Sequence, residues 1–518
     1  MNKKDKFHKA PTIRIGIIQS AETVTFKCHE DFQIVDVNNQ VKFAGRASTG
    51  YVCDMSSPKP AKVTYQIRTG LYRDLELARE RSDLLKEKGF EPKIRRVGLT
   101  IPFETVTLDN RDYWLVVGDF ESRNEAEKQL STLPDTDDST VVENIETHAS
   151  GEISIDGQKL GSRIRVIPSK PDAHIAVDKV PIGIEFHWQR TETLEYRGIL
   201  EIGFNNSGEL EAINELNIED YLASVNSSEM TPDCPIALLE AQTIAARSTV
   251  LATMGKHHYN TSYHLCSDDH CQCYQGVLRE QDISRKAVEN TYGEFLMYGG
   301  DVCDARYSKI CGGIIENYRN VWDERDIPYL VDGIDSEEKI EYPADTEDKA
   351  QRLIDSSPPV FCNTDIHELP PKLANLYSTE NLFRWEVSYK REEIEQLIRE
   401  KNNVDIGELQ DIIPLSRGAS GRIIYIKIVG SKRTITVGKE LNIRRLFSKS
   451  HLYSSCFYVK KVLSGEGKVD RITLKGGGWG HGVGLCQVGA TVMALKGYHY
   501  TEILKHYFKN IEIKKLYF

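Results

Sequence analysis

The chain has 518 residues, of which 40% are hydrophobic and 28% charged; this is ordinary globular composition and enough for roughly three or four domains. Its net charge of −11 argues against a general nucleic-acid-binding protein, which would present a basic face. The sequence contains no apolar run of the roughly 18 residues that a membrane-crossing helix needs, so no transmembrane segment is predicted.

Residues 1–20, MNKKDKFHKAPTIRIGIIQS, begin with basic residues but lack the apolar region of a signal peptide. From this pattern we expect either a cytoplasmic protein or one whose leader is missing from the sequence. From Thr12, short alternating runs (IRIGII, TVTFKC, FQIVDV, QVKFAG) predict β-strands, and strands resume from Gly151. We expect residues 11–60 and 148–217 to form one β block, because a domain inserted at a loop tip is well tolerated.

The intervening residues 61–147, here called the insert, contain an internal repeat of strand, glycine, aromatic residue and helix. Alternating apolar residues in VTYQIRTGLY and helical spacing in LELARERSDLLKE predict a compact ferredoxin-like βαββαβ unit. The strand endings at residues 65–72 and 114–120 resemble those of the SPOR domain, which implies peptidoglycan binding. The alternative is an α+β packing unit without a ligand.

An Ala-rich segment that begins near Pro235 predicts a helix, with Asp233 and Pro235 as its N-terminal signals. Its small side chains allow close backbone approach, so we expect a central buried helix. Glu229 precedes this helix in the segment NSSEM, next to Met230. A carboxylate on a loop that enters a helix suits acid/base chemistry, although a turn or helix-entry carboxylate is the alternative.

Four motifs, in this order, resemble the stage II sporulation protein D / amidase-enhancer (SpoIID/LytB) family. They are LNIEDYLASVNSSEM with AQTIAARS, CSDDHCQCY, YSKICGGIIEN and GGGWGHGVGLCQVGA, at residues 216–248, 266–274, 307–317 and 476–490. The resemblance covers most of the chain outside the insert. It implies an α+β fold whose SpoIID-like core has several subdomains, is rich in β-strands and surrounds the buried Ala-rich helix, with residues 218–518 as the catalytic-type core.

The resemblance implies a cell-wall protein. Some members are lytic transglycosylases that cleave peptidoglycan glycan strands lacking stem peptides, and one branch enhances amidases. We therefore expect a lytic transglycosylase, with a non-catalytic glycan-binding protein that enhances a cell-wall amidase as the alternative and a structural envelope protein as a third. A peptidoglycan substrate requires a location in the cell envelope, periplasmic or extracytoplasmic, although no signal peptide is visible.

Glu229 matches the family's functional glutamate, which implies a single general acid/base that forms 1,6-anhydro-muramyl ends. One carboxyl group suffices because the sugar's own C6 hydroxyl replaces the water of ordinary glycosidases. Burial against apolar neighbours would raise the pKa of such an acid. Substrate contacts are expected from Ser228, Gln242, Arg247, Gln272, Tyr274, Ser308, Gly312, Gly313, Trp479, His481 and Gln487.

Several of these residues have a structural alternative. Gln242 and Arg247 are expected to line the groove. The alternative for Arg247 is a buried ion pair with a carboxylate. His481 either orients Glu229 or is a structural histidine. Gly312 and Gly313 indicate a tight turn with exposed amides, and Trp479 suits stacking on a sugar.

Cysteines are crowded between residues 266 and 311, which favours metal or redox chemistry over a disulfide framework. Some family members hold zinc, and the matching ligands here are Cys266 and His270. A structural zinc is the only cofactor expected. Further ligands would come from Cys271, Cys273 or Cys311, the last of which stands where the family commonly has serine. A disulfide or free thiols are the alternative.

Overall fold

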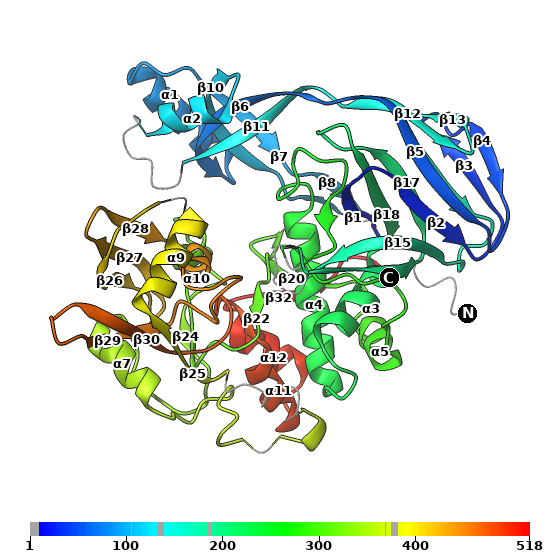
Figure 1. Cartoon of the computed structure of the whole chain (residues 1–518). Coiled ribbons are helices and arrows are strands. Elements are labelled where there is room, and N and C mark those ends of the chain that lie inside the picture. Colours follow the sequence, from blue (N-terminus) through cyan, green and yellow to red (C-terminus); the bar gives the residue numbers. More distant parts are fainter. Residues whose placement is uncertain are drawn as a thin grey trace.

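The computed structural model describes residues 10–104, 106–131, 139–184, 189–268, 270–367, 369–373, 382–402 and 404–518. The fold is a β-rich mixture of helices and several sheets, which confirms the α+β class. Strands dominate the first 217 residues, a group of helices occupies the centre, and smaller sheets with further helices form the C-terminal part (Figure 1). None of the helices in these ranges is long and apolar enough to span a membrane.

Two sheets make up the N-terminal β region. The larger has the order β19 (Leu265–Cys266), β1 (Thr12–Ala21), β18 (Leu210–Asn217), β17 (Ile199–Phe204), β14 (Ile164–Pro168), β3 (Phe32–Asp36) and β4 (Val41–Gly45). The other has the order β13 (Gln158–Gly161), β12 (Ser150–Ile155), β5 (Gly50–Lys59), β2 (Val24–Cys28), β15 (Ile175–Ile182) and β16 (Arg190–Tyr196). Strands from both sides of the insert pair directly, β5 with β12 and β1 with β18.

The insert forms one four-stranded antiparallel sheet with the order β11 (Thr140–Thr147), β6 (Lys62–Tyr72), β10 (Asp112–Phe120) and β7 (Pro92–Val97). Helix α1 (Leu75–Glu87) follows β6 and α2 (Arg123–Leu130) follows β10, while β8 (Thr100–Pro102) and β9 (Thr107–Asp109) form a small hairpin. The side chain of Asp74 caps α1 by accepting from the Leu77 amide at 2.9 Å. The chain enters and leaves this unit through long strands that run back to the β region (Figure 1).

One side of the insert packs against the end of the central helix and the segment that follows it. The Trp114 ring meets the Tyr259 ring edge-on at 4.6 Å between centroids. Asn110, which is 7% exposed, donates from Nδ2 to the carbonyls of Leu251 and Met254 at 2.6 and 3.0 Å. These carbonyls belong to the last turn and C-cap of the central helix α4 (Ile236–Thr253), where no intrahelical amide is available to them.

Helix α4 is the centre of the molecule because it is buried on nearly all its faces, as expected from its small and apolar residues. Around it lie α3 (Ile218–Glu229), α5 (Asp282–Asn290), α11 (Gln487–Leu495), α12 (Tyr500–Tyr507) and β20 (Glu294–Tyr298). Strand β20 pairs with β21 (Asp301–Val302) across a hairpin at Gly299-Gly300, and with β32 (Glu512–Lys515). Replacing a side chain such as Leu239 with alanine should cost about 2–5 kcal/mol, because the surrounding core cannot close the cavity.

Short strand pairs connect this centre to the C-terminal part. They are β22 (Tyr307–Ser308) with β31 (Leu485–Cys486), and β23 (Ile314–Ile315) with β24 (Gly333–Ile334). Beyond them lie two three-stranded sheets, β25 (Arg384–Lys390)–β30 (Val469–Gly477)–β29 (Phe457–Leu463) and β26 (Leu409–Arg417)–β27 (Ile423–Gly430)–β28 (Thr434–Gly438). The accompanying helices are α6 (Tyr318–Val321), α7 (Glu347–Asp355), α9 (Arg391–Asn402) and α10 (Glu440–Leu446).

Candidate functional site

A cleft of about 2120 Å³ runs between the insert, the end of α4 and the C-terminal part. Its walls combine residues from all three regions, for example Arg68 and Trp114 of the insert, His258 after α4, and Arg444 of α10. Nine of the residues singled out from the sequence line it: Glu229, Cys266, His270, Cys271, Cys273, Ser308, Trp479, His481 and Gln487.

Glu229 is the last residue of α3, so the expectation that it lies on a loop was wrong. Asn217 caps the start of the helix, since its side chain accepts from the Asp220 amide at 2.9 Å, and the helix ends because Met230 is extended. Oε1 of Glu229 accepts a hydrogen bond of 3.2 Å from the backbone N–H of Cys273. Burial raises the pKa of Glu229, opposed by this amide, by the charge of Lys309 and by a hydrogen bond with Tyr307.

Tyr307 hydrogen-bonds with both Glu229 and His481, the acid and the histidine expected to orient it. Its side chain hydrogen-bonds with Glu229, and its backbone hydrogen-bonds with the ring of His481. Nδ1 of His481 accepts from the Val483 amide at 3.0 Å. Burial, followed by the charge of nearby arginines such as Arg306, holds the pKa of His481 well below its usual range. The imidazole is therefore neutral and is fixed beside the acid without a direct bond to it.

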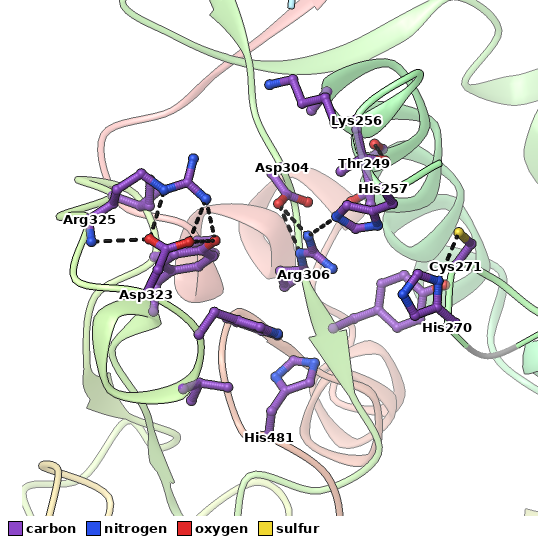
Figure 2. A pocket seen from close by; sticks show the side chains of 18 of the residues that line it. Thr249, Lys256, His257, His270, Cys271, Asp304, Arg306, Asp323, Arg325 and His481 are labelled. Atoms are coloured by element: carbon purple, nitrogen blue, oxygen red, sulfur yellow. Dashed lines mark hydrogen bonds and ion pairs between the residues drawn. The ribbon is translucent and has the colours of Figure 1, made fainter. Parts of the chain in front are cut away.

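Charged pairs line the cleft around this centre (Figure 2). Arg306 donates to Asp304 at 2.7 Å and lies over the Trp322 ring at 5.0 Å, while Trp322 packs against His481 at 4.8 Å between centroids. Asp323 receives hydrogen bonds from Arg325, and the pKa of Asp323 is lowered because these interactions outweigh its burial. The pair with Arg325 anchors the loop that carries Asp323, and the pKa values of Asp323 and Glu229 are shifted in opposite directions.

A second feature of the cleft is a group of four metal-binding side chains: His258, Cys266, His270 and Cys271. Their ligand atoms all lie within 4.8 Å of one another. Cys271 Sγ is 3.3 Å from Nε2 of His258 and 3.7 Å from Nδ1 of His270, and Cys266 Sγ is 3.9 Å from the same Nδ1. Zinc bonds of about 2.3 Å to sulfur and about 2.0 Å to nitrogen, arranged tetrahedrally, would separate such atoms by about 3.6 Å.

The donor set of two thiols and two imidazoles therefore suits a structural zinc. The pKa of Cys266 is lowered by its hydrogen bond with Cys271 and then by the two histidines, so this thiol readily becomes the thiolate that a metal needs. The other open candidates lie elsewhere: Cys273 offers its amide to Glu229, and Cys311 belongs to a different group. None of the cysteines forms a disulfide in the part of the chain that the structure describes.

Several predicted contact residues lie in the core instead of the cleft. Tyr274 is 2% exposed, donates to Asn214 at 2.7 Å and packs beside Tyr221. Gln272 accepts from the Tyr221 hydroxyl at 2.9 Å. Gln242 is buried on α4, and its amide has no hydrogen-bond partner among the described residues. The structure thus corrects the expectation that these three residues reach the substrate, because the sequence does not reveal which side of a buried segment faces the cleft.

Arg247 forms a fully buried ion pair with Glu219, at 2.6 Å between Nη2 and Oε2. Nη1 of Arg247 also donates to the Glu294 carbonyl at 3.1 Å, so α3, α4 and β20 are tied together. This pairing is the structural alternative considered for Arg247, and it excludes the groove-lining role in this structure. Glu219 is correspondingly a structural carboxylate.

Gly312, Gly313 and Ser228 are not among the residues that line the cleft. Gly312 and Gly313 form the expected turn, with φ of 87° and 113°, which side chains other than glycine rarely adopt. A Cβ on Gly312 would meet the Gly478 backbone at 3.2 Å, so this turn packs against the glycine-rich segment. Ser228 Oγ is buried without a hydrogen-bond partner among the described residues.

Three functional candidates were missed. Tyr307 and Lys309 flank Ser308 within the motif YSKICGG, so their proximity to Ser308 was the available signal. His258 lies before CSDDHC, in the segment HHYNTSYHLC. This segment contains several histidines, so the sequence does not show which of them is a metal ligand.

Three segments of the chain match known protein families. Residues 206–298 match the family described as Stage II sporulation protein (SpoIID), residues 61–142 match the SPOR domain, and residues 316–484 match a domain of unknown function, DUF8618. An uncharacterized protein of Brachyspira hyodysenteriae is 29% identical over 335 residues, which cover 64% of this chain and 76% of that protein.

Two named relatives are more distant. The protein called amidase enhancer in Bacillus subtilis is 26% identical over 303 residues, covering 55% of this chain and 39% of the relative. Stage II sporulation protein D of Bacillus amyloliquefaciens is 22% identical over 318 residues, covering 59% of this chain and 76% of the relative.

Proposed function

We propose that this chain, which belongs to the SpoIID/LytB family and carries a SPOR domain, is a lytic transglycosylase that cleaves peptidoglycan glycan strands lacking stem peptides. The observation that supports the proposal is the position of Glu229: a partly buried carboxyl group with a raised pKa in the large cleft. A general acid must hold its proton near the working pH, and burial provides this.

Glu229 would act twice. Its protonated form donates to the glycosidic oxygen as the bond to C1 breaks. The resulting carboxylate takes the proton of the C6 hydroxyl, whose oxygen bonds to C1 and closes the 1,6-anhydro ring. The Cys273 amide and the Tyr307 side chain stabilise the carboxylate between these steps, since hydrogen bonds to the charged form favour it.

The rest of the cleft would bind the glycan. Trp479, 38% exposed on the cleft wall, offers an aromatic face to sugar C–H groups. His481, Ser308 and Gln487 would hydrogen-bond with hydroxyls or acetamido groups. Tyr307 and Lys309 join this set because both line the cleft beside Glu229.

We assign a structural zinc to His258, Cys266, His270 and Cys271. When bound, the metal would supply no chemistry to the reaction beyond fixing the segment 266–273. That segment carries the Cys273 amide to Glu229, so the metal would position the acid's hydrogen-bond donor.

The insert's role follows from its family, since SPOR domains bind peptidoglycan. Its βαββαβ order and antiparallel sheet support a ferredoxin-like unit spanning residues 61–147. We divide the rest into the β block at 11–60 and 148–217 and the catalytic-type core at 218–518. Both assigned activities concern peptidoglycan, which supports a location in the cell envelope, outside the cytoplasm.

The second candidate is a glycan-binding protein that enhances a cell-wall amidase, as the name of the Bacillus subtilis relative suggests. Digestion of purified denuded glycan by the wild-type protein and by Glu229→Gln separates the two. Anhydro-muramyl ends, detected by mass spectrometry for the wild type only, are expected. Glycan binding without such ends, together with faster hydrolysis by an added amidase, would favour the enhancer.

A further inference from the structure

A second group of metal-binding side chains lies behind the cleft: Cys311, Asp335, Cys362 and Cys486. All four are at most 2% exposed, and their ligand atoms lie within 4.8 Å of one another. They come from four separate segments: the loop after β22, the end of β24, the segment after α7, and β31. Spacing in the sequence could not reveal them, because 175 residues separate Cys311 from Cys486.

The distances match tetrahedral zinc. Cys311 Sγ is 3.6 Å from Cys362 Sγ and 3.4 Å from Oδ2 of Asp335. Zinc–sulfur bonds of about 2.3 Å and zinc–oxygen bonds of about 2.1 Å at tetrahedral angles give about 3.8 Å between sulfurs and about 3.6 Å from sulfur to oxygen. A disulfide needs about 2.05 Å between its sulfurs, so the Cys311 and Cys362 thiols are separate.

The buried carboxylate of Asp335 also favours a cation at this position. Its side chain is fully buried; among the described residues no lysine or arginine forms an ion pair with it, and Nε2 of His506 lies 3.6 Å from Oδ1. Oδ1 accepts from the Tyr507 hydroxyl at 2.8 Å, and Oδ2 accepts from the Cys362 amide at 3.1 Å. Burying a carboxylate is costly, and coordination to a cation would offset that cost.

The surroundings resemble the outer shell of a metal site. Tyr507 orients the carboxylate, the Cys311 amide donates to Cys486 Sγ at 3.2 Å, and the Gly489 amide donates to the same sulfur at 3.4 Å. A Cβ on Gly489 would lie 2.6 Å from Asp335 Oδ2, so only glycine leaves this space open. Such hydrogen bonds to sulfur stabilise a thiolate, the form in which cysteine binds metals.

We propose that Cys311, Asp335, Cys362 and Cys486 bind a structural zinc ion, distinct from the His258 cluster. The ion would connect the segments that carry Cys311, Asp335 and Cys362 to strand β31, which carries Cys486. Cys486 caps α11 and pairs in register with Ser308, and the Lys309 carbonyl accepts from the Val488 amide at 3.1 Å. Ser308, Lys309 and Gln487 all line the cleft, so this zinc would fix the wall that faces Glu229.

The test is zinc content in the full chain, purified with zinc present and then dialysed. In a Cys266→Ala/Cys271→Ala background, which removes the first cluster, about one zinc per chain is expected. Adding Cys362→Ala should reduce this at least fivefold. The matched control is Cys303→Ala, because Cys303 is equally buried in the same core but lies outside both clusters. Unchanged zinc with Cys362→Ala would overturn the proposal.

A measurement on the wild-type protein avoids dependence on folding of the variants. Anomalous diffraction at the zinc edge should give a peak between Cys311, Cys362 and Cys486. The Cys266→Ala/Cys271→Ala substitutions should leave this peak in place. The experiment therefore tests this zinc site separately from the zinc site at His258, Cys266, His270 and Cys271. Absence of the peak, or a Cys311–Cys362 disulfide in peptide maps, would refute a metal at this position.

Discussion

The backbone N–H of Cys273 donates to Oε1 of Glu229 at 3.2 Å, two residues after Cys271, one of the four candidate metal ligands. The candidate acid at the end of α3 and the metal cluster after α4 are therefore neighbours connected through one short segment. A change in the cluster reaches Glu229 through its hydrogen-bond donor, without any ligand of the metal touching the acid.

Glu229→Gln should lower the formation of anhydro-muramyl ends by about 10²–10⁴-fold, because the amide cannot donate or accept the reacting proton. Glycan binding should persist, since the shape of the side chain is kept. The rate is measured by mass spectrometry of digested denuded glycan. Glu240→Gln is the control, because Glu240 is a buried carboxylate bonded to Asn290 and lies outside the cleft lining. An equal loss in both variants would count against the assignment.

The same substitution should raise the thermal stability at neutral pH. Burial raises the pKa of Glu229 in the folded protein, so the folded state binds more protons than the unfolded state between the unfolded and folded pKa values. Stability is lost as the pH rises through this window, and glutamine removes that loss. Melting curves should show a higher Tm for Glu229→Gln at pH 7 and a smaller difference at pH 4. A gain that is independent of pH would argue for a packing effect instead.

Tyr307→Phe should shift the pH profile of kcat/KM. The Tyr307 hydrogen bond and the charge of Lys309 both lower the pKa of Glu229, so their removal raises it further. Activity that needs protonated Glu229 is lost above this pKa, and the alkaline limb should therefore move to higher pH. Lys309→Met should move it in the same direction. A shift toward lower pH in either variant would contradict the contacts described.

Arg247→Met should destabilise the fold by about 3–5 kcal/mol, because it leaves the Glu219 carboxylate buried without its partner. The double variant with Glu219→Gln should recover part of the loss. Denaturant unfolding and hydrogen exchange of α4 report the effect. The control is Arg279→Met, whose pair with Glu192 is partly exposed and should matter by less than about 1 kcal/mol.

His258→Ala should remove about one zinc ion per chain, since His258 supplies one of four ligands. The neighbouring His257→Ala should retain it, because His257 is exposed and lies outside the cluster. Metal analysis measures the difference, and the anhydro-product assay should show a parallel loss through the displaced Cys273 amide. Equal zinc content in the two variants would exclude His258 as a ligand.

The sequence predicts what depends on local pattern. The α+β class, the buried Ala-rich helix and the turn at Gly312 follow from residue type and spacing, and Glu229 and His481 follow from motifs. Which face a buried segment presents depends on tertiary packing, so Tyr274 and Arg247 could not be assigned to the core from spacing alone. His258 and Asp335 illustrate the same limit, since their partners are brought together only by the fold.

The two hydrogen bonds from Asn110 to the end of α4 have a mechanical consequence. The insert is held against the helix whose end lines the same cleft as Glu229, so the insert is part of the cleft wall. A glycan strand held on the insert would meet Glu229 at a constant offset. The distance between the insert and Glu229 would then set the lengths of the released glycan fragments.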